Sequence, residues 1–184
     1  MKSWIVALLF VALPGVVQAA SYKTDYANSK ITFSGTHAGN AFSGTFQSWQ
    51  AVIQFDPVAL NNSQIDITVD MASAKTGNTM YDGTLPTADW FDLKNHPQAT
   101  YSSKHITRND DGSYTAQGTL TLRAVSKPLA IQFALTPAEP AVKTTFTLTI
   151  DRLAYGIGAS SDPKAEWVNK DITLNVILVA QPVL

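Results

Sequence analysis

The stretch Gln64-Ile65-Asp66-Ile67-Thr68-Val69-Asp70-Met71 carries the pattern that decides the fold. Its odd positions are apolar and its even positions are polar, so an extended backbone presents one apolar and one hydrophilic face. Residues 145–150 repeat the pattern, with Phe146, Leu148 and Ile150 alternating with threonines. Such alternation is typical of antiparallel strands that have one face on a core and the other in water.

Further runs rich in Thr, Val, Ile and aromatic residues extend over the chain, separated by turn residues. Together the eight runs are Lys30–Thr36, Phe42–Phe55, Gln64–Met71, Ala99–Ile106, Tyr114–Leu122, Val125–Leu135, Val142–Arg152 and Asp171–Ala180. Eight mostly antiparallel strands predict an all-β fold, and an up-and-down barrel is the expected architecture. A β-sandwich stays open as the alternative, because periodicity does not distinguish the two.

The run Phe42–Phe55 is long and changes phase. Its apolar residues stand at even positions up to Phe46 and at odd positions from Trp49 onward. A β-bulge near Gln47-Ser48 would bring both halves to the same face of the sheet, and a bulged strand bends. We therefore expect a curved or closed sheet rather than a flat one.

Two segments lack alternation. In Thr76–Asn95, glycine, proline and aspartate are frequent, and we predict a short helical segment at about residues 76–95 that caps one end of the barrel. Asp89 and Asp92 are interpreted there as helix caps. The segment Tyr155–Val168 is predicted to be a long loop.

The N-terminus has the features of a targeting signal. Lys2 precedes an apolar stretch, and Val17-Gln18-Ala19 supplies the small residues of a cleavage site. The apolar run from Trp4 is shorter than the roughly 20 residues of a membrane-spanning helix. We therefore predict a cleaved secretory signal peptide at residues 1–19 and a single domain at residues 21–184, located outside the cytoplasm.

Composition excludes several classes of function. The chain has 184 residues, no cysteine and a formal net charge of -1. It therefore lacks the basic surface of nucleic-acid binders and all cysteine-based chemistry. His37, His96 and His105 lack the spacing of metal ligands, and no nucleophile elbow or phosphate loop is found. We expect no catalytic residues, no metal and no required cofactor.

Tryptophans and phenylalanines are spread over most of the predicted strands and both irregular segments. For any single residue, an ordinary aromatic core is the simpler explanation. As a group they favour a barrel with an apolar lining, and a barrel of eight strands either fills with side chains or encloses one small ligand.

Four fragments occur in a specific order. They are Phe55-Asp56-Pro57 followed by Leu60 and Ser63, then Asp82, Leu85 and Asp89-Trp90-Phe91-Asp92, then His96-Pro97-Gln98-Ala99-Thr100-Tyr101, and Gly118-Thr119-Leu120-Thr121-Leu122 leading to Lys127-Pro128. With the tail Arg152 to Gly158, they resemble the YceI family of bacterial lipid-binding proteins over about Tyr22 to Ala180.

The resemblance implies a lipocalin-like, eight-stranded antiparallel barrel. It also implies that the bore binds a polyisoprenoid chain, such as the tail of an isoprenoid quinone, or a related lipid. A periplasmic location is implied as well, in agreement with the predicted signal peptide. A partner of the cytochrome b561 type is expected from the same resemblance, by analogy alone.

The chain departs from the family pattern at two places. Many relatives have Arg-Asp-x-His-Leu where this chain has Tyr81-Asp82-Gly83-Thr84-Leu85, so the basic residue and the imidazole are missing. Relatives also tend to have glycine at the position of Ala124, in a predicted hairpin turn. If that turn needs a positive φ, the alanine is strained.

The hypothesis from the sequence is a carrier that sequesters a long apolar chain. The candidate ligand-binding residues are Phe33, Phe46, Val69, Phe133, Phe146 and Leu148 on the bore and Met80, Leu85, Trp90 and Phe91 at the helical cap, with His37 and Asp82 as polar candidates at the mouth. One alternative is an interaction module with a solid barrel that docks a membrane cytochrome. Another is an enzyme acting on a lipid inside the barrel, which would need Asp82 or His37 near the cavity.

Overall fold

The computed structural model describes residues 19–183, in which β-strands predominate and every strand pair is antiparallel. The predicted signal peptide, apart from Ala19, lies outside the described residues. The strands are β1 (Ala20–Thr24), β2 (Lys30–His37), β3 (Asn40–Phe46), β4 (Trp49–Phe55), β5 (Gln64–Asp70), β6 (Ala74–Lys75), β7 (Gln98–Arg108), β8 (Tyr114–Leu122), β9 (Val125–Phe133), β10 (Thr136–Ala138), β11 (Ala141–Asp151) and β12 (Asp171–Pro182). The helical elements are α1 (Thr79–Thr84) and the short 3-10 turns η1 (Leu60–Asn62), η2 (Met71–Ser73) and η3 (Leu153–Tyr155).

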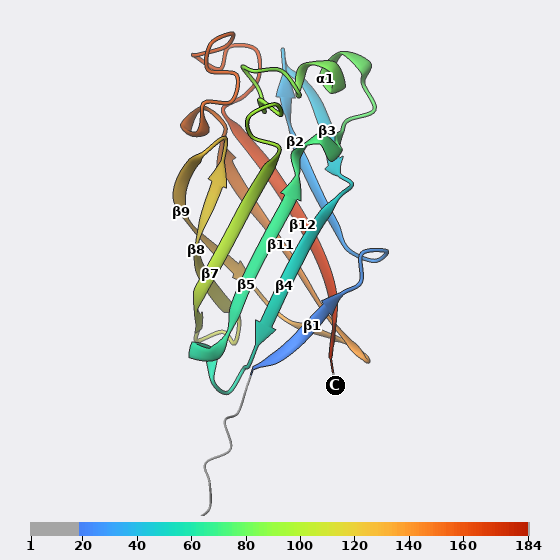
Figure 1. The fold of residues 1–184 in the computed structure, drawn as a ribbon, viewed down its shortest axis with the longest axis vertical. Helices are drawn as coiled ribbons and strands as arrows, with labels where there is room; N and C mark the ends of the chain where they lie inside the picture. The colour runs from blue at the N-terminus through green and yellow to red at the C-terminus, as the bar shows by residue number, and fades with distance from the viewer. Residues whose placement is uncertain (1–18, 184) are drawn as a thin grey trace, which may run out of the picture.

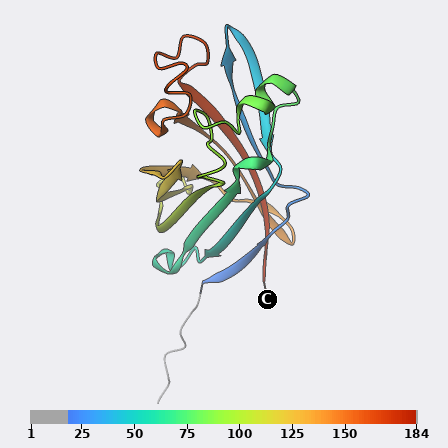
Figure 2. The same ribbon diagram turned by 45° about the horizontal axis from the view of Figure 1, so that its top comes forward.

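Strand β12 joins the two halves of the sheet (Figure 1). One of its edges pairs with β11 over residues 171–180. The other edge pairs first with β2, through Thr173–Ile177, and then with β1. From β2 the sheet continues through β3 to β6, and from β1 it runs through β4, β5, β7 and β8 to β9. The strands thus curl around one interior, as the turned view in Figure 2 shows.

The expected eight-stranded closed barrel is wrong in two respects. Over residues 19–183 the sheet has twelve strands, and it is not closed. The second apolar run divides at Gln47-Ser48 into β3 and β4, where its phase changes, and the periodicity does not predict the short strands β1, β6 and β10. Within residues 19–183, β9 and β11 lie next to each other without a ladder, because that edge of β11 pairs only with β10.

The predicted helical segment at residues 76–95 contains one helix, α1, which has six residues. The side chain of Asn78 begins it by accepting hydrogen bonds from the backbone N–H groups of Met80 and Tyr81, at 2.9 and 3.3 Å. Hydrogen-bonded turns form the rest of the segment. Asp89 and Asp92 therefore do not cap helices, contrary to the prediction.

Arg152 and Asp162 organise the loop between β11 and β12. Both side chains are buried, and the guanidinium donates to the Asp162 carboxylate at 2.7 Å. The same guanidinium donates to the carbonyl oxygens of Ile157 and Val168, both at 2.7 Å, and lies over the ring of Trp90 at 5.6 Å. A buried charge is tolerated when it is paired and hydrogen-bonded in this way. This ion pair, rather than a helix or a strand ladder, supports the loop.

Asp89 ties the segment after α1 to that same loop. Its carboxylate accepts hydrogen bonds from the N–H groups of Ser160 and Ser161, at 2.8 and 2.9 Å, and from the Ser161 hydroxyl at 2.5 Å. Burial raises the pKa of Asp89, but the hydrogen bonds from Ser161 and Ser160 outweigh burial and lower the pKa from 3.8 to about 2. The ionised carboxylate therefore holds two loops together.

The turn between β8 and β9 consists of two residues in the left-handed region. Leu122 and Val125 are paired across it, and Arg123 and Ala124 have φ values of 47° and 61°. Two positive φ values are characteristic of a type I′ hairpin, which favours Asn or Gly. The Arg123 side chain donates to the carbonyl oxygens of Ala88 and Asp89, at 2.9 and 3.1 Å, so the turn is fixed to the segment after α1.

Replacement of Ala124 by glycine is expected to stabilise the protein. Removing the left-handed penalty of an exposed alanine should exceed the added freedom of the unfolded chain, for a net gain of about 0.5 to 1 kcal/mol. Urea denaturation of Ala124→Gly measures this gain. Ala130→Gly, on exposed extended backbone in β9, is the matched control and should lose about 0.5 to 1 kcal/mol. Equal losses in both variants would contradict the assigned turn.

Replacement of Asp89 by asparagine is expected to lower the free energy of unfolding by about 1 to 3 kcal/mol at neutral pH. Because the folded-state pKa of Asp89 lies below its ordinary value of 3.8, its contribution is present above that value and is lost as the pH falls toward about 2. Denaturation of wild type and variant across this range should therefore converge at low pH. Asp110→Asn, at an exposed position, is the control and should change the free energy of unfolding by less than about 0.5 kcal/mol at neutral pH.

Candidate functional site

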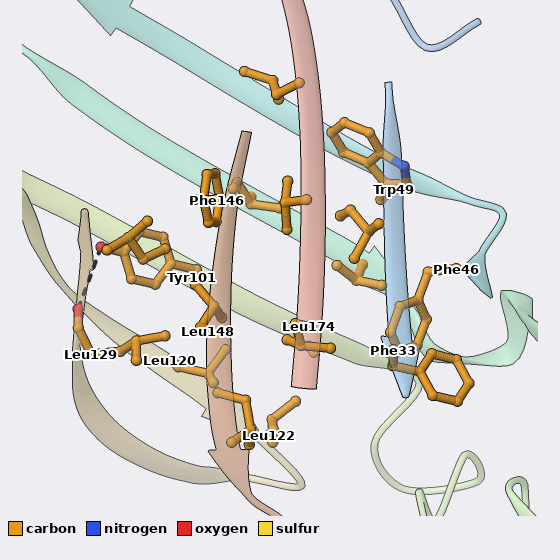
Figure 3. A pocket seen from close by; sticks show the side chains of 18 of the residues that line it. Phe33, Phe46, Trp49, Tyr101, Leu120, Leu122, Leu129, Phe146, Leu148 and Leu174 are labelled. Carbon is orange, nitrogen blue, oxygen red and sulfur yellow. Dashed lines mark hydrogen bonds between the residues drawn. The ribbon is translucent and has the colours of Figure 1, made fainter. Parts of the chain in front are cut away.

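The inner face of the sheet encloses a cavity of about 240 Å³. The surface exposed to the cavity is apolar throughout. A cavity retains ordered water only where polar partners are available, so this space favours apolar groups. In Figure 3, labelled side chains from strands around the curved sheet point into this common space.

Strand register aligns the cavity wall across neighbouring strands. Leu148 of β11 is paired with Leu174 of β12, Leu174 with Phe33 of β2, and Phe33 with Gly44 of β3. Paired residues in a sheet project to the same face, so this row points inward together. Gly44 has no side chain, and the ring of Phe33 fills the space above it, 5.1 Å from the ring of Phe46.

The opposite wall includes one buried tyrosine. The Tyr101 hydroxyl donates a hydrogen bond to the carbonyl oxygen of Ala116 at 2.9 Å. Burial raises the pKa of Tyr101, so the phenol stays neutral. Its hydroxyl is therefore engaged with the sheet, and the ring presents an apolar surface.

The six residues predicted for the bore can be located in the structure. The cavity lining includes Phe33, Phe46, Val69, Phe133, Phe146 and Leu148. They lie on β2, β3, β5, β9 and β11. Their contact with a ligand stays a prediction.

At one end, the cavity is lined by residues of the segment that follows α1. Leu85, Trp90 and Phe91 belong to the lining, and the ring of Phe91 lies 6.5 Å from that of Phe46. Met80 does not belong to the lining, because its side chain on α1 is 59% exposed. The cap thus consists of the turns that follow α1 rather than of α1 itself.

Neither polar mouth candidate lines the cavity. His37 Nδ1 lies 3.0 Å from the Tyr81 hydroxyl, and Asp82 accepts hydrogen bonds from the N–H and hydroxyl of Thr76, both at 2.7 Å. The hydrogen bonds from Thr76 lower the pKa of Asp82. These two side chains therefore support loops in the structure, and a role in binding a head group stays a prediction.

Sequence reasoning did not assign Arg152, Trp49 or Tyr101 to the cavity, although all three line it. Arg152 occurs in a fragment that resembles the family, which was its only signal. Its charge is neutralised by Asp162, whose own pKa is lowered by backbone hydrogen bonds and by Arg152 despite burial. The cavity therefore offers no free charge to a ligand among the residues that line it.

Residues 19–183 lack two other features, a cluster of metal ligands and a membrane-spanning helix. No group of three or more His, Cys, Asp and Glu side chains could hold a metal ion in this part of the chain. None of the helices described there is long and apolar enough to cross a membrane.

Comparison with known proteins places the chain in a family. The model of the YceI-like domain matches residues 22–180. A UPF0312 protein of Vibrio parahaemolyticus is 30% identical over 125 residues, and the match covers 66% of each protein.

Solved structures share the fold. BcnA from Burkholderia cenocepacia superposes with a TM-score of 0.80 at 25% identity, covering 85% of this chain and 99% of that one. A polyisoprenoid binding domain from Saccharophagus degradans superposes with a TM-score of 0.70 over 89% of this chain and 99% of that one, and at 13% identity this likeness concerns the fold alone. Because the family model extends over nearly all the described residues, the chain belongs to the YceI-like family.

Proposed function

We propose that the protein binds a polyisoprenoid, or a similarly long apolar lipid, in its cavity and sequesters or carries it in the periplasm. The observation that carries the proposal is an apolar cavity inside the sheet, in which the polar groups of Tyr101 and Arg152 are hydrogen-bonded to the sheet and to Asp162. The Saccharophagus degradans domain, named for polyisoprenoid binding, adds support through its similar fold.

The energetics of burial favour a long ligand. Each buried methylene contributes about 0.8 kcal/mol, so one five-carbon unit contributes roughly 3 to 4 kcal/mol. Three or four units would offset the roughly 4 to 15 kcal/mol that association costs. Chain length should therefore determine affinity more than hydrogen bonds to a head group do.

The periplasmic setting of this proposal rests on the predicted signal peptide. A membrane partner of the cytochrome b561 type rests on family resemblance, and it would connect the bound chain with quinone chemistry. The rival interaction module requires a solid barrel, which the cavity disfavours. The rival lipid enzyme requires Asp82 or His37 at the cavity, and neither residue lines it.

Protein secreted by its native host is expected to contain an isoprenoid in near-stoichiometric amount. Mass spectrometry of an organic extract of the purified protein measures it. Protein that carries no lipid, and takes none up from isoprenoid-containing vesicles, would favour the interaction module instead.

Replacement of Val69 by tryptophan is expected to lower ligand retention at least about tenfold, because loss of two buried methylenes already costs roughly 1.6 kcal/mol. Val69 is paired with Trp49 and Ala99, so the larger side chain would project into the cavity among them. Val52→Trp is the matched control, since Val52 lies on β4 with 61% of its surface exposed. Mass spectrometry and circular dichroism compare the two variants. Equal ligand retention in both folded variants would contradict the assignment of Val69 to the ligand-binding wall.

A further inference from the structure

An aromatic cluster lies at the end of the cavity opposite the loops. Phe55 ends β4, Tyr114 begins β8 and Phe133 ends β9, and all three are buried. The ring centroid of Tyr114 lies 5.1 Å from that of Phe55 and 5.6 Å from that of Phe133. The ring centroids of Phe55 and Phe133 are 6.3 Å apart. Phe55 and Phe133 belong to the cavity lining. We call these three residues the aromatic floor.

The two ends of the cavity differ in how they are built. The floor residues lie within hydrogen-bonded ladders, and Tyr114 is paired directly with Phe133. At the other end, Leu85 and Trp90 belong to turns held by local backbone hydrogen bonds and by the Arg123 side chain, which donates to the carbonyl oxygens of Ala88 and Asp89. Opening a loop costs less free energy than breaking a ladder in the core of a sheet. A chain bound as proposed would therefore enter from the loop end, and its apolar terminus would meet the floor.

This geometry limits the length of chain that can be buried. Each methylene that leaves water raises affinity by about fourfold, whatever its place along the uniformly apolar wall. Once the terminus reaches the aromatic floor, further units stay in water and contribute nothing. Affinity should rise with chain length up to one limiting length and then level off. We call this limiting length the break.

We propose that the aromatic floor sets the longest isoprenoid chain that the protein buries, so that Phe133 is a specificity-determining residue. The inference rests on the proposed function. Ala116 contributes from the same place, because it is 1% exposed, lines the cavity and packs in one cluster with the floor. A larger side chain at Ala116 would raise the floor, and a smaller one at Phe133 would lower it.

The test uses all-trans isoprenoid alcohols that grow by one isoprene unit at a time. Binding is followed by tryptophan fluorescence, since Trp49 and Trp90 line the cavity. In the wild type, affinity should rise at least about tenfold per unit up to the break and change less than about twofold beyond it. Phe133→Leu should move the break to longer chains, and Ala116→Leu should move it to shorter ones.

Phe46→Leu is the matched control. It makes the same change in a wall residue that contacts Phe91 of the cap, far from the floor. It should alter affinity for every chain and leave the break in place. Circular dichroism checks folding, and Ala116→Leu carries the test if Phe133→Leu does not fold.

The outcomes separate the two proposals. If the wild type binds these alcohols and the break is absent or stays at one length in both floor variants, the aromatic floor does not measure chain length. If no alcohol of any length binds the wild type, the proposed function itself fails, and the inference fails with it.

Discussion

The structure depends on one constraint, which is that side chains of an extended strand alternate between two faces. The ladders of this sheet obey it apart from the register shift between Ser103 and His105 in β7, so that rows such as Leu148, Leu174 and Phe33 point inward together. Once the sheet curls, the inner face has no second layer to pack against. The inward side chains must then pack against one another across the interior, and here they leave a cavity between them.

A network of polar interactions supports the loops at one end of that interior. Arg152 and Asp162 are buried together, and Asp89 and Arg123 connect the loop between β11 and β12 with the turns after α1. Such an arrangement suits a segment that has no ladder to satisfy its backbone groups. It also removes charge from the cavity, because the one charged side chain in the lining is fully paired.

If it binds a lipid as proposed, a site of this kind would select ligands by shape and apolar length. The tyrosine hydroxyl in the wall is bonded to the sheet, and the two polar candidates named from the sequence support loops. Little remains in the lining to orient a polar group. Discrimination by the proposed site would then come from how much apolar chain the cavity accommodates, since hydrophobic contacts are non-directional and add with buried area.

Much of the fold and of the cavity wall could be predicted from the sequence, because alternation is a local property. The eight runs mark real strands, the phase change at Gln47-Ser48 marks the division between β3 and β4, and Phe33, Phe46 and Leu148 point inward as their positions require. The suspected strain at Ala124 also agrees with its positive φ, since a two-residue turn has few conformations.

By itself, then, the sequence determined which face of each strand is apolar. Tertiary structure alone decided that the sheet stays open between β9 and β11, that its side chains leave a cavity, and that Met80 lies outside it. It also brought Arg152 to Asp162 and Asp89 to Ser160 and Ser161. The physical reason is that closure, packing volume and the pairing of buried charges depend on distances between segments far apart in the chain, which no local pattern encodes.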